Sequence, residues 1–436
     1  MTREAATGRS EGEPMAESAR IRRAVYITTT EPEPRSYGKR VVMGGILDYL
    51  CDTLGGENVH LILIAKPDVE LRPTRYRIHL LPKPRSSEQA WSLVSRVAAG
   101  PHTSIQEAAV YAPRIAREIR ELLATIDADL EVWDTIRTGQ YAAGVPRRRR
   151  LLYEDDLFSE RYKTMLRELS GRSNKQVNPL GEFHKMLPRP ARPLLSRRAV
   201  YRPLLRLESR LVGASERNQP GWFDATLLVN DEETNRLRTF TGRTDIHTLL
   251  PMLPEVAPRD RAPVGARFAF LGGLDYAPNT DGLTWFLTHC REQVLAALPN
   301  FELLVIGKGT EVGVPEAAAW GEHVKFVGWV DDLGETLAGC SALLSVLRVG
   351  SGIKIKVLEA LSRSLPVVAT PYGVQGTEVG EENGCLIGST PADLAALLAR
   401  AADPDTNQTL SAAARETWEK RFAPDVIRRS YDEFFS

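Results

Sequence analysis

The sequence lacks the features that mark several large classes of protein. No run of about 18 apolar residues occurs in its 436 residues, so no transmembrane helix is expected. The first twenty residues contain no apolar core, which predicts a flexible tail over residues 1–20 rather than a signal peptide. The seven histidines and four cysteines follow no metal-ligand or Cys-x-x-Cys spacing. We therefore expect no metal site, no disulfide framework and a reducing, cytoplasmic location.

Net charge is also absent, because 56 basic residues balance 56 acidic ones. The two halves differ, however. Residues 1–220 hold 37 Lys and Arg against 27 Asp and Glu, whereas the remainder holds 19 against 29. A nucleic-acid-binding protein is more often basic overall, so we expect no nucleic-acid partner and one basic face on the N-terminal half.

The length and the order of apolar segments predict two α/β domains. A chain of this size is too long for one ordinary hydrophobic core. Short apolar segments alternate with helical ones in both halves, which is typical of doubly wound parallel sheets. The proline-rich segment 249–265 is interpreted as a linker between residues 21–248 and 266–422. Ligands of such sheets bind beyond the carboxyl ends of the strands, so we expect the site in the cleft between two Rossmann-like domains.

The expected elements follow from the apolar runs and the helix stops. In the N-terminal half we expect helices ending near 54 and over 104–126, a polar loop at 38–40, and strands over 25–29, 59–64, 130–133, 151–153 and 225–229. In the C-terminal half we expect helices over 280–298 and 425–435, and strands over 268–271, 303–306, 325–328, 342–346 and 367–369.

Residues 350–361, GSGIKIKVLEAL, carry the most informative chemistry. A glycine-rich turn before a helix exposes backbone N–H groups, which favours an anion. Lys354 and Lys356 add two cations to the expected first helical turn, where positive charge is unfavourable, so we expect a diphosphate to compensate them. Glu359 follows Lys356 by three residues, where it would accept hydrogen bonds from a ribose. The alternative is an ordinary surface pair of Lys356 and Glu359.

Several segments, taken in order, resemble the family 4 (group 1) glycosyltransferases of the GT-B fold. They are residues 270–279 with Asp281, Trp285 and Phe286, then 305–307, 327–332, 350–360 and 366–370, with Gly373 and Gly376. The resemblance is dense from about 266 to 402 and looser before it. It implies a retaining transferase that moves a sugar from a nucleotide-diphosphate sugar on the C-terminal domain to an acceptor hydroxyl on the N-terminal one. It also implies that no metal or other cofactor is needed, since basic side chains neutralise the leaving diphosphate.

The resemblance implies roles for residues of the C-terminal half. Glu359 matches the family's second glutamate, which contacts the ribose, whereas Ser351 stands at the position of the first. The usual Arg and Lys after the first strand are replaced by residues 274–276, Leu-Asp-Tyr, so Lys354 and Lys356 become the main expected diphosphate ligands. The remaining positions of the implied donor site are Gly350, Ser351, Gly352, Gly376 and Thr377 at the diphosphate and Val327, Gly328 and Trp329 at the base.

Two N-terminal segments are implied to face the cleft. Asp155 and Asp156, followed by Ser159, Arg161 and Tyr162, resemble an acidic stretch of the family at the carboxyl end of a strand. One of these acids would contact the acceptor or stabilise positive charge at the anomeric carbon, and with Glu359 they are the predicted catalytic residues. The alternative is a helix N-cap. Gly38 and Lys39 resemble the family's first loop, which approaches donor and acceptor, with an ordinary exposed loop as the alternative.

Residues 185–210 hold eight Lys and Arg against one acid. Arg198, Arg202, Arg206 and Arg210 recur every four residues, while residues 200, 204, 207 and 211 form an apolar stripe, which predicts a cationic amphipathic helix. It would either rest on an anionic membrane and reach a lipid-linked acceptor, or pack on its own domain with a solvated Arg face. Arg147 to Arg150 form a second basic cluster, which is consistent with the flank of a buried strand.

Two rival functions remain at this point. A catalytically idle scaffold of the same fold is favoured by Ser351 at the position of the first glutamate. A nucleotide-sugar 2-epimerase would need acids and a histidine grouped around the sugar, and the sequence does not group them. The pair Asp127 and Asp129 is interpreted as a helix-to-strand turn rather than a metal site, and residues 423–436 are expected to form a helix that crosses back to the N-terminal domain.

Overall fold

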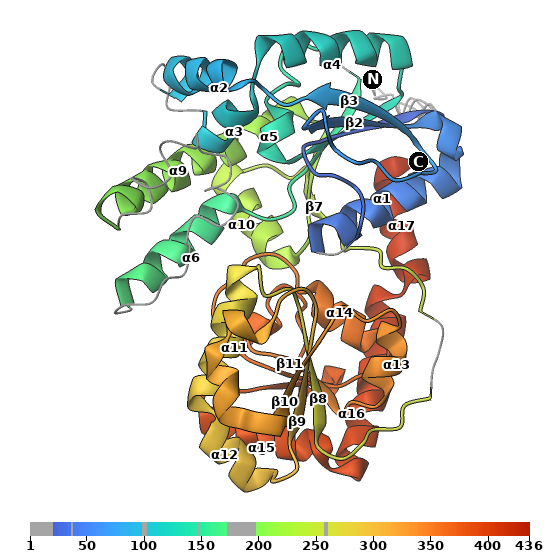
Figure 1. The fold of residues 1–436 in the computed structure, drawn as a ribbon. Coiled ribbons are helices and arrows are strands. Elements are labelled where there is room, and N and C mark those ends of the chain that lie inside the picture. The colour runs from blue at the N-terminus through green and yellow to red at the C-terminus, as the bar shows by residue number, and fades with distance from the viewer. Residues whose placement is uncertain (1–20, 36–37, 98–102, 147, 172–197, 257–259) are drawn as a thin grey trace, which may run out of the picture.

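The computed structural model describes residues 21–35, 38–97, 103–146, 148–171, 198–256 and 260–436. Figure 1 shows two domains, one above the other, each built on a parallel sheet with helices on both faces. The predicted fold of two doubly wound domains is confirmed. The predicted tail over residues 1–20 lies outside the described residues.

The N-terminal sheet joins seven parallel strands in the described part of the chain. Their order is β3-β2-β1-β4-β5-β6-β7. The strands are β1 Ala24–Thr28, β2 Val59–Ala65, β3 Arg77–Pro82, β4 Leu130–Asp134, β5 Arg149–Tyr153, β6 Ala225–Leu228 and β7 Ile246–Thr248. The helices around them are α1 Gly38–Leu54, α2 Ser86–Ser92, α3 Ile105–Val110, α4 Pro113–Ile126, α5 Thr135–Gly139, α6 Phe158–Gly171, α9 Arg198–Asn218 and α10 Asp231–Thr241. Central strands such as β1 and β2 are buried along their whole length, as the continuous apolar runs predict.

The C-terminal sheet joins six parallel strands among the described residues, in the order β10-β9-β8-β11-β12-β13. The strands are β8 Arg267–Leu271, β9 Glu302–Ile306, β10 Val324–Gly328, β11 Ala342–Ser345, β12 Val367–Ala369 and β13 Cys385–Ile387. The helices are α11 Ala277–His289, α12 Arg291–Ala297, α13 Leu333–Ala338, α14 Ile355–Leu361, α15 Pro391–Ala402 and α16 Pro404–Thr417. Carboxyl ends of strands from both sheets thus supply the loops between the domains.

Three element predictions are wrong, each for a local reason. The single helix expected over 104–126 is two helices, because Pro113 disfavours a helical conformation for Ala112, which is extended. The helix expected over 280–298 is divided at Cys290 into α11 and α12. Residues 38–40, expected as a loop, are the first turn of α1.

Helix α17, Pro424–Phe435, leaves the C-terminal domain and packs on α1 of the N-terminal one (Figure 1). Tyr431 and Phe435 are fully buried against Tyr49, with ring centroids 5.3 and 5.9 Å from the Tyr49 ring. The Arg149 guanidinium donates hydrogen bonds to the last carbonyls of this helix, including that of Phe434 at 3.1 Å. Chain connectivity and apolar packing therefore join the two domains at a second point besides the linker.

In the basic cluster at residues 147–150, the arginines that the structure describes all bind groups of the protein itself. Arg148 pairs with Asp127 at 2.5 Å, and Arg149 binds the carbonyls of α17. Arg150 is buried in an ion pair with Glu131 at 2.8 Å. Arg147 lies outside the described residues.

The turn between α4 and β4 contains Asp127 and Asp129, and both have a role in the fold. Asp127 ends α4 in the left-handed conformation, and Asp129 accepts hydrogen bonds from the backbone N–H groups of Arg22 and Arg23 at 2.9 and 3.0 Å. Within the described ranges, no cluster of His, Cys, Asp or Glu forms a metal site, and the four cysteines are buried thiols.

Helices α6 and α9 run side by side and project from the N-terminal domain (Figure 1). The apolar stripe predicted for α9 is partly wrong. Leu211 is buried as expected, but Leu205 is buried where no stripe residue was expected, and Leu207 is 45% exposed. The reason is that α9 packs on α3 and α6 with a face rotated from the predicted one. Arg206 and Arg210 are exposed, whereas residues 185–197 and the Arg198 side chain lie outside the described residues.

Within the described ranges, every helix falls short of the length and hydropathy that a membrane span requires.

Candidate active site

The loop 350–354 joins β11 to α14 and lies where the two domains meet. The helix begins at Ile355, so Lys354 is its N-cap residue, and of the two lysines expected in the first turn only Lys356 stands there. Helix α14 has seven residues, which makes its dipole small. The positive potential at this loop therefore comes from the two lysine side chains.

Lys354 folds back over its own loop. Its ammonium donates hydrogen bonds to the carbonyls of Ser351 and Gly352 at 3.0 and 2.9 Å. Gly350 makes room for this conformation, because a Cβ there would lie 3.3 Å from the Lys354 ammonium. Burial lowers the pKa of Lys354 to about 8, against the opposing effect of the Glu233 carboxylate. The loop thus holds a cation on its own backbone.

Lys356 turns in the other direction, towards α11. Its ammonium donates to Oδ1 of Asn279 at 2.8 Å and lies 4.9 Å from the centre of the Phe270 ring. Burial, and then the Lys354 charge, lower the pKa of Lys356 to about 7. In the part of the chain that the structure describes, no carboxylate forms an ion pair with Lys356. A half-buried cation without an anionic partner is unfavourable, and a bound anion would relieve it.

Glu359 does not pair with Lys356, so the alternative of an ordinary surface pair between them is wrong. Its carboxylate accepts a hydrogen bond from Arg363, four residues later, at 2.8 Å. The Glu359 side chain is 22% exposed. The rotation of α14 sends Lys356 to Asn279 on a neighbouring helix, a contact that spacing along one helix does not predict. Glu359 remains accessible at the edge of the loop, as a ribose ligand would need to be.

The remaining C-terminal positions take different roles. Gly376 has φ of 80°, and a Cβ there would lie 2.8 Å from the Gly352 carbonyl, so this turn packs directly on the lysine loop. Thr377 is buried, and both its N–H and its hydroxyl donate to the Val374 carbonyl. The Thr377 amide is therefore hydrogen-bonded within its own turn.

Val327 and Gly328 end the edge strand β10, and Trp329 follows it directly. The Gly328 carbonyl accepts a hydrogen bond from Gly307 at 2.8 Å, which ties the end of β10 to the loop after β9. Val327 is 41% exposed and Trp329 is 69% exposed. An exposed indole beside free strand-edge backbone is a suitable surface for a planar base.

On the N-terminal side, Asp156 reaches across to the lysine loop. Ser351 donates a hydrogen bond to the Asp156 carboxylate. Arg161, from α6, binds both carboxylate oxygens of Asp156 at 2.6 Å and donates to the Ser351 hydroxyl at 3.1 Å. Asp156 is 2% exposed. The predicted acidic stretch and the predicted glycine loop, 195 residues apart, are thus in direct contact.

Asp155 and Lys39 form the adjacent wall. Asp155 accepts a hydrogen bond from Tyr153 at 3.2 Å, and burial together with the Asp156 charge raises its pKa, against the effect of Lys39. Lys39 forms an ion pair with the buried Asp134. Gly38 packs on Ile355 of α14, where a Cβ would lie 3.2 Å from the isoleucine side chain.

Sequence reasoning missed several residues that the fold brings to this site. Asp134 ends β4 and accepts hydrogen bonds from Lys39 and from Thr28 at the end of β1. The following Thr135 has φ of 64°, a strained conformation for a β-branched residue. Glu233, on α10, accepts a long hydrogen bond from the Gly352 N–H at 3.4 Å, and burial raises its pKa to about 7. Asp134 could have been found from the sequence, because it is a polar residue directly after the predicted buried strand 130–133. No feature of the sequence marks Glu233 as a site residue.

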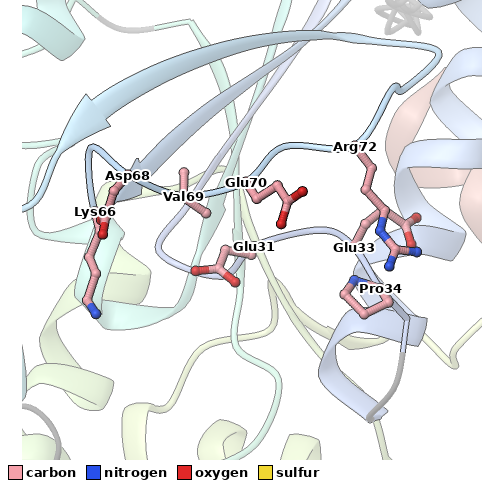
Figure 2. Close-up of a pocket in the computed structure, with 8 residues that line it drawn as sticks. All are labelled: Glu31, Glu33, Pro34, Lys66, Asp68, Val69, Glu70 and Arg72. Carbon is pink, nitrogen blue, oxygen red and sulfur yellow. The ribbon is translucent and has the colours of Figure 1, made fainter.

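A polar cavity of about 380 Å³ lies beyond the carboxyl ends of β1 and β2. Figure 2 shows Lys66 and Asp68 on one side of it and Arg72 on the other, with Glu31 and Glu70 between them. Glu31 pairs with Arg40 at 2.8 Å, at the start of α1. The full lining is Glu31, Glu33, Pro34, Lys66, Asp68, Val69, Glu70 and Arg72. The size suits a small polar ligand.

Known proteins resemble this chain in part of its sequence and in its fold. Residues 265–403 match the family described as Glycosyl transferases group 1. The structure is similar to HepE of Anabaena in complex with UDP, with a TM-score of 0.61, 11% identity and coverage of 94% of this chain and 98% of that one. No significant match occurs among curated protein sequences.

Two further structures are similar over nearly their whole length. WaaG, a glycosyltransferase involved in lipopolysaccharide biosynthesis, has a TM-score of 0.60 and 13% identity and covers 95% of this chain and 100% of its own. Sucrose-phosphate synthase from Thermosynechococcus elongatus has a TM-score of 0.61 and 15% identity, and the match covers 95% of this chain and 98% of that one. The chain therefore has the two-domain GT-B fold, and the predicted resemblance to group 1 glycosyltransferases is confirmed through its C-terminal domain.

Proposed function

We propose that the chain is a glycosyltransferase that moves a sugar from a nucleotide-diphosphate sugar to an acceptor hydroxyl, with retention of configuration and without a metal ion. The observation that carries the proposal is the pair Lys354 and Lys356, which stand at the end of one glycine loop and in the first turn of the helix after it, between the domains of a GT-B fold. Lys356 is half-buried and has no carboxylate partner in the described ranges, so a diphosphate would neutralise its charge.

The donor is proposed to lie along the C-terminal domain. Its diphosphate would face Lys354 and Lys356, its ribose Glu359, and its base the end of β10 near Trp329. UDP is the first nucleotide to test, because the similar HepE structure is a complex with UDP. Binding of the diphosphate would raise the pKa of both lysines towards their ordinary value, since each would gain an anionic partner.

The transfer step needs no protein nucleophile. The bond between the anomeric carbon and the diphosphate oxygen breaks, and the acceptor oxygen bonds to the same face of that carbon. The acceptor proton passes to the departing phosphate oxygen, so charge and atoms balance. One of the acids Asp155 and Asp156 would stabilise the positive charge that develops at the anomeric carbon, because they belong to the N-terminal segment that contacts the loop before α14.

The acceptor is proposed to enter from the N-terminal domain. The cavity between Glu31 and Arg72 opens beside the loop that leads to Lys39, and its polar lining suits hydroxyl groups. The lining carries both signs of charge, so the acceptor would be a polar molecule such as a glycan or a glycosylated headgroup.

Thermal unfolding tests the donor site. Purified protein without added metal is compared with UDP, GDP, dTDP, ADP and CDP, for the wild type, Lys356→Gln and Glu359→Gln. A nucleotide that binds only the folded state stabilises it by about 2.7 kcal/mol at a hundredfold excess over Kd, and both substitutions should reduce that gain. Glu419→Gln is the matched control, because Glu419 is also bound by an arginine four residues away, far from the loop.

Release of nucleoside diphosphate from the matching donor sugar then separates transfer from binding alone. Turnover in the presence of EDTA supports the metal-independent step, and an α-linked product from an α-linked donor supports retention. Nucleotide binding without turnover on any offered acceptor would favour the idle scaffold. No stabilisation by any nucleotide would overturn the donor site.

A further inference from the structure

The polar groups of the lysine loop that face the cleft are already occupied by carboxylates of the N-terminal domain. The Ser351 hydroxyl donates to Asp156, and the Gly352 N–H points to Glu233 at 3.4 Å. A Cβ at Gly352 would lie 3.4 Å from Asp156 Cβ, so the loop and the aspartate are in van der Waals contact. A hydroxyl, a backbone N–H and a lysine are donors suited to a phosphate.

The same two carboxylates balance the charge of Lys354. Glu233 and then Asp156 are the anionic groups that most favour its protonated form, and they come from different elements, α10 and the loop after β5. Lys356, on the far side of the loop, has no such partner in the described ranges. The N-terminal domain therefore presents two carboxylates and one guanidinium, that of Arg161, to the half of the proposed site around Ser351 and Lys354. It presents no carboxylate to Lys356 within the described ranges.

We propose that Asp156 and Glu233 form an interdomain latch that occupies the diphosphate loop in the free protein and that a diphosphate must displace. The inference rests on the proposed donor site and adds its regulation. An anion bound at Ser351 and Lys354 would place its charge beside two carboxylates, and this repulsion costs binding energy until the carboxylates move away. Donor binding and the contact between the domains are thus coupled and oppose each other.

Glu233 is the member of the latch that can be tested without changing the predicted catalytic residues. Its second carboxylate oxygen accepts a hydrogen bond from Asn230 at 2.8 Å. Glutamine at this position keeps that bond through its carbonyl oxygen and turns an amide N–H towards the Gly352 N–H. The fold is retained, while the negative charge and the acceptor for Gly352 are both lost.

Calorimetric titration of the full chain with UDP, and separately with inorganic pyrophosphate, measures the competition. At constant pH and ionic strength, Glu233→Gln should bind either probe about fivefold or more tightly than the wild type. Glu232→Gln is the matched control, because it removes the same charge from the adjacent residue, which is exposed and pairs with Arg236. Its affinity should stay within about twofold of the wild type.

Equal affinities of the wild type and Glu233→Gln for UDP would overturn the latch and leave the donor site standing. Absence of binding in every variant would overturn the donor site and the competition together. Small-angle scattering without ligand gives an independent reading. Glu233→Gln and Ser351→Ala should both show a larger radius of gyration than the wild type. Scattering profiles that are unchanged in both variants would overturn the latch.

Discussion

The ammonium of Lys356 lies 2.8 Å from Oδ1 of Asn279, so this lysine of the donor loop is held by a neutral amide. Burial and the Lys354 charge lower its pKa to about 7, which means that the free protein loses this charge as the pH rises through neutrality. A diphosphate needs the charged form. If the diphosphate binds at Lys356 as proposed, nucleotide affinity depends on the protonation of this residue.

We predict that the Kd for the nucleoside diphosphate rises from pH about 6 to about 9 in the wild type and that binding takes up protons at pH about 7. Calorimetric titration in two buffers of different ionisation enthalpy measures the uptake. Lys356→Arg keeps its charge throughout this range, so its uptake should be smaller and its Kd less dependent on pH. Equal proton uptake in the wild type and in Lys356→Arg would contradict the assignment to Lys356.

A second prediction concerns stability. Glu216, on α9, accepts a hydrogen bond from the Ser159 N–H at the start of α6 at 3.1 Å, and burial raises its pKa from 4.5 to about 8. Because the folded state then holds the proton more tightly than the unfolded chain, its contribution to stability is greatest at low pH and is lost as the pH rises towards 8. Urea unfolding measures the free energy of unfolding at pH 5 and at pH 8. Between these values it should fall by at least about 1 kcal/mol more in the wild type than it does in Glu216→Gln.

The control for this experiment is Glu121→Gln, on the exposed face of α4. It should follow the pH dependence of the wild type, since an exposed carboxylate has a similar environment in both states. If Glu216→Gln and Glu121→Gln gave the same curve, the buried carboxyl of α9 would not be the titrating group.

Most strands and the segment around Lys354 were predictable, because each is marked by residues that are adjacent in the sequence. Continuous apolar runs located β1, β2 and β9, and the segment around Lys354 was recognisable from adjacent residues. Strands β3, β7 and β13 were missed. Strand β3 is a partly exposed edge strand with Arg77 and His79, and the other two have three residues each, so no apolar run marks them.

The contacts of the site depend on residues far apart in the sequence, and for that reason they were not predictable. Lys356 meets Asn279, 77 positions earlier, and Gly352 meets Glu233, 119 positions earlier. Spacing also left a pair of Lys356 and Glu359 open as an alternative. This pair does not form, because spacing along one helix ignores which neighbours cover each face. Glu233 lies in the acidic first turn of α10 beside Glu232. The two residues differ only in that the fold buries the face of α10 that carries Glu233.

A third prediction tests the buried pair of Arg150 and Glu131. Arg150 also donates to the carbonyls of Val145 and Pro146, so its charge is fully enclosed. Glu131→Gln leaves that charge without its partner and should lower the free energy of unfolding by about 3 kcal/mol. The double substitution Glu131→Leu with Arg150→Met should cost less than Glu131→Gln, as measured by urea unfolding. A double variant that is less stable than the single one would show that the pair is stabilising in itself.

A fourth prediction concerns the helix that returns to the N-terminal domain. Phe435 is fully buried beside Tyr49, and truncation leaves a cavity that the rigid neighbours do not fill. Phe435→Ala should therefore lower the free energy of unfolding by about 3–5 kcal/mol. Phe240→Ala, at a ring that is 45% exposed, should change it by less than half of that amount. Similar losses in thermal and urea unfolding for both variants would argue against the role of α17 as core.

The last prediction tests the expected membrane contact of α9. Arg206 and Arg210 are exposed and lie one turn apart on this helix, beside the exposed Leu207. Each arginine near an anionic surface contributes about 1 kcal/mol, so reversing both charges should weaken binding by about tenfold or more. The wild type should sediment with phosphatidylglycerol vesicles at low salt and not with phosphatidylcholine vesicles. Arg206→Glu with Arg210→Glu should remain in solution.

The matched control reverses two exposed cations of the C-terminal domain, as Arg415→Glu with Lys420→Glu. It changes the net charge by the same amount, so a general loss of attraction would affect it equally. If binding depends on α9, this variant should sediment with phosphatidylglycerol vesicles as the wild type does. A wild type that stays in solution with both lipids would contradict the membrane contact and leave the arginines as the solvated face of a helix packed on its own domain.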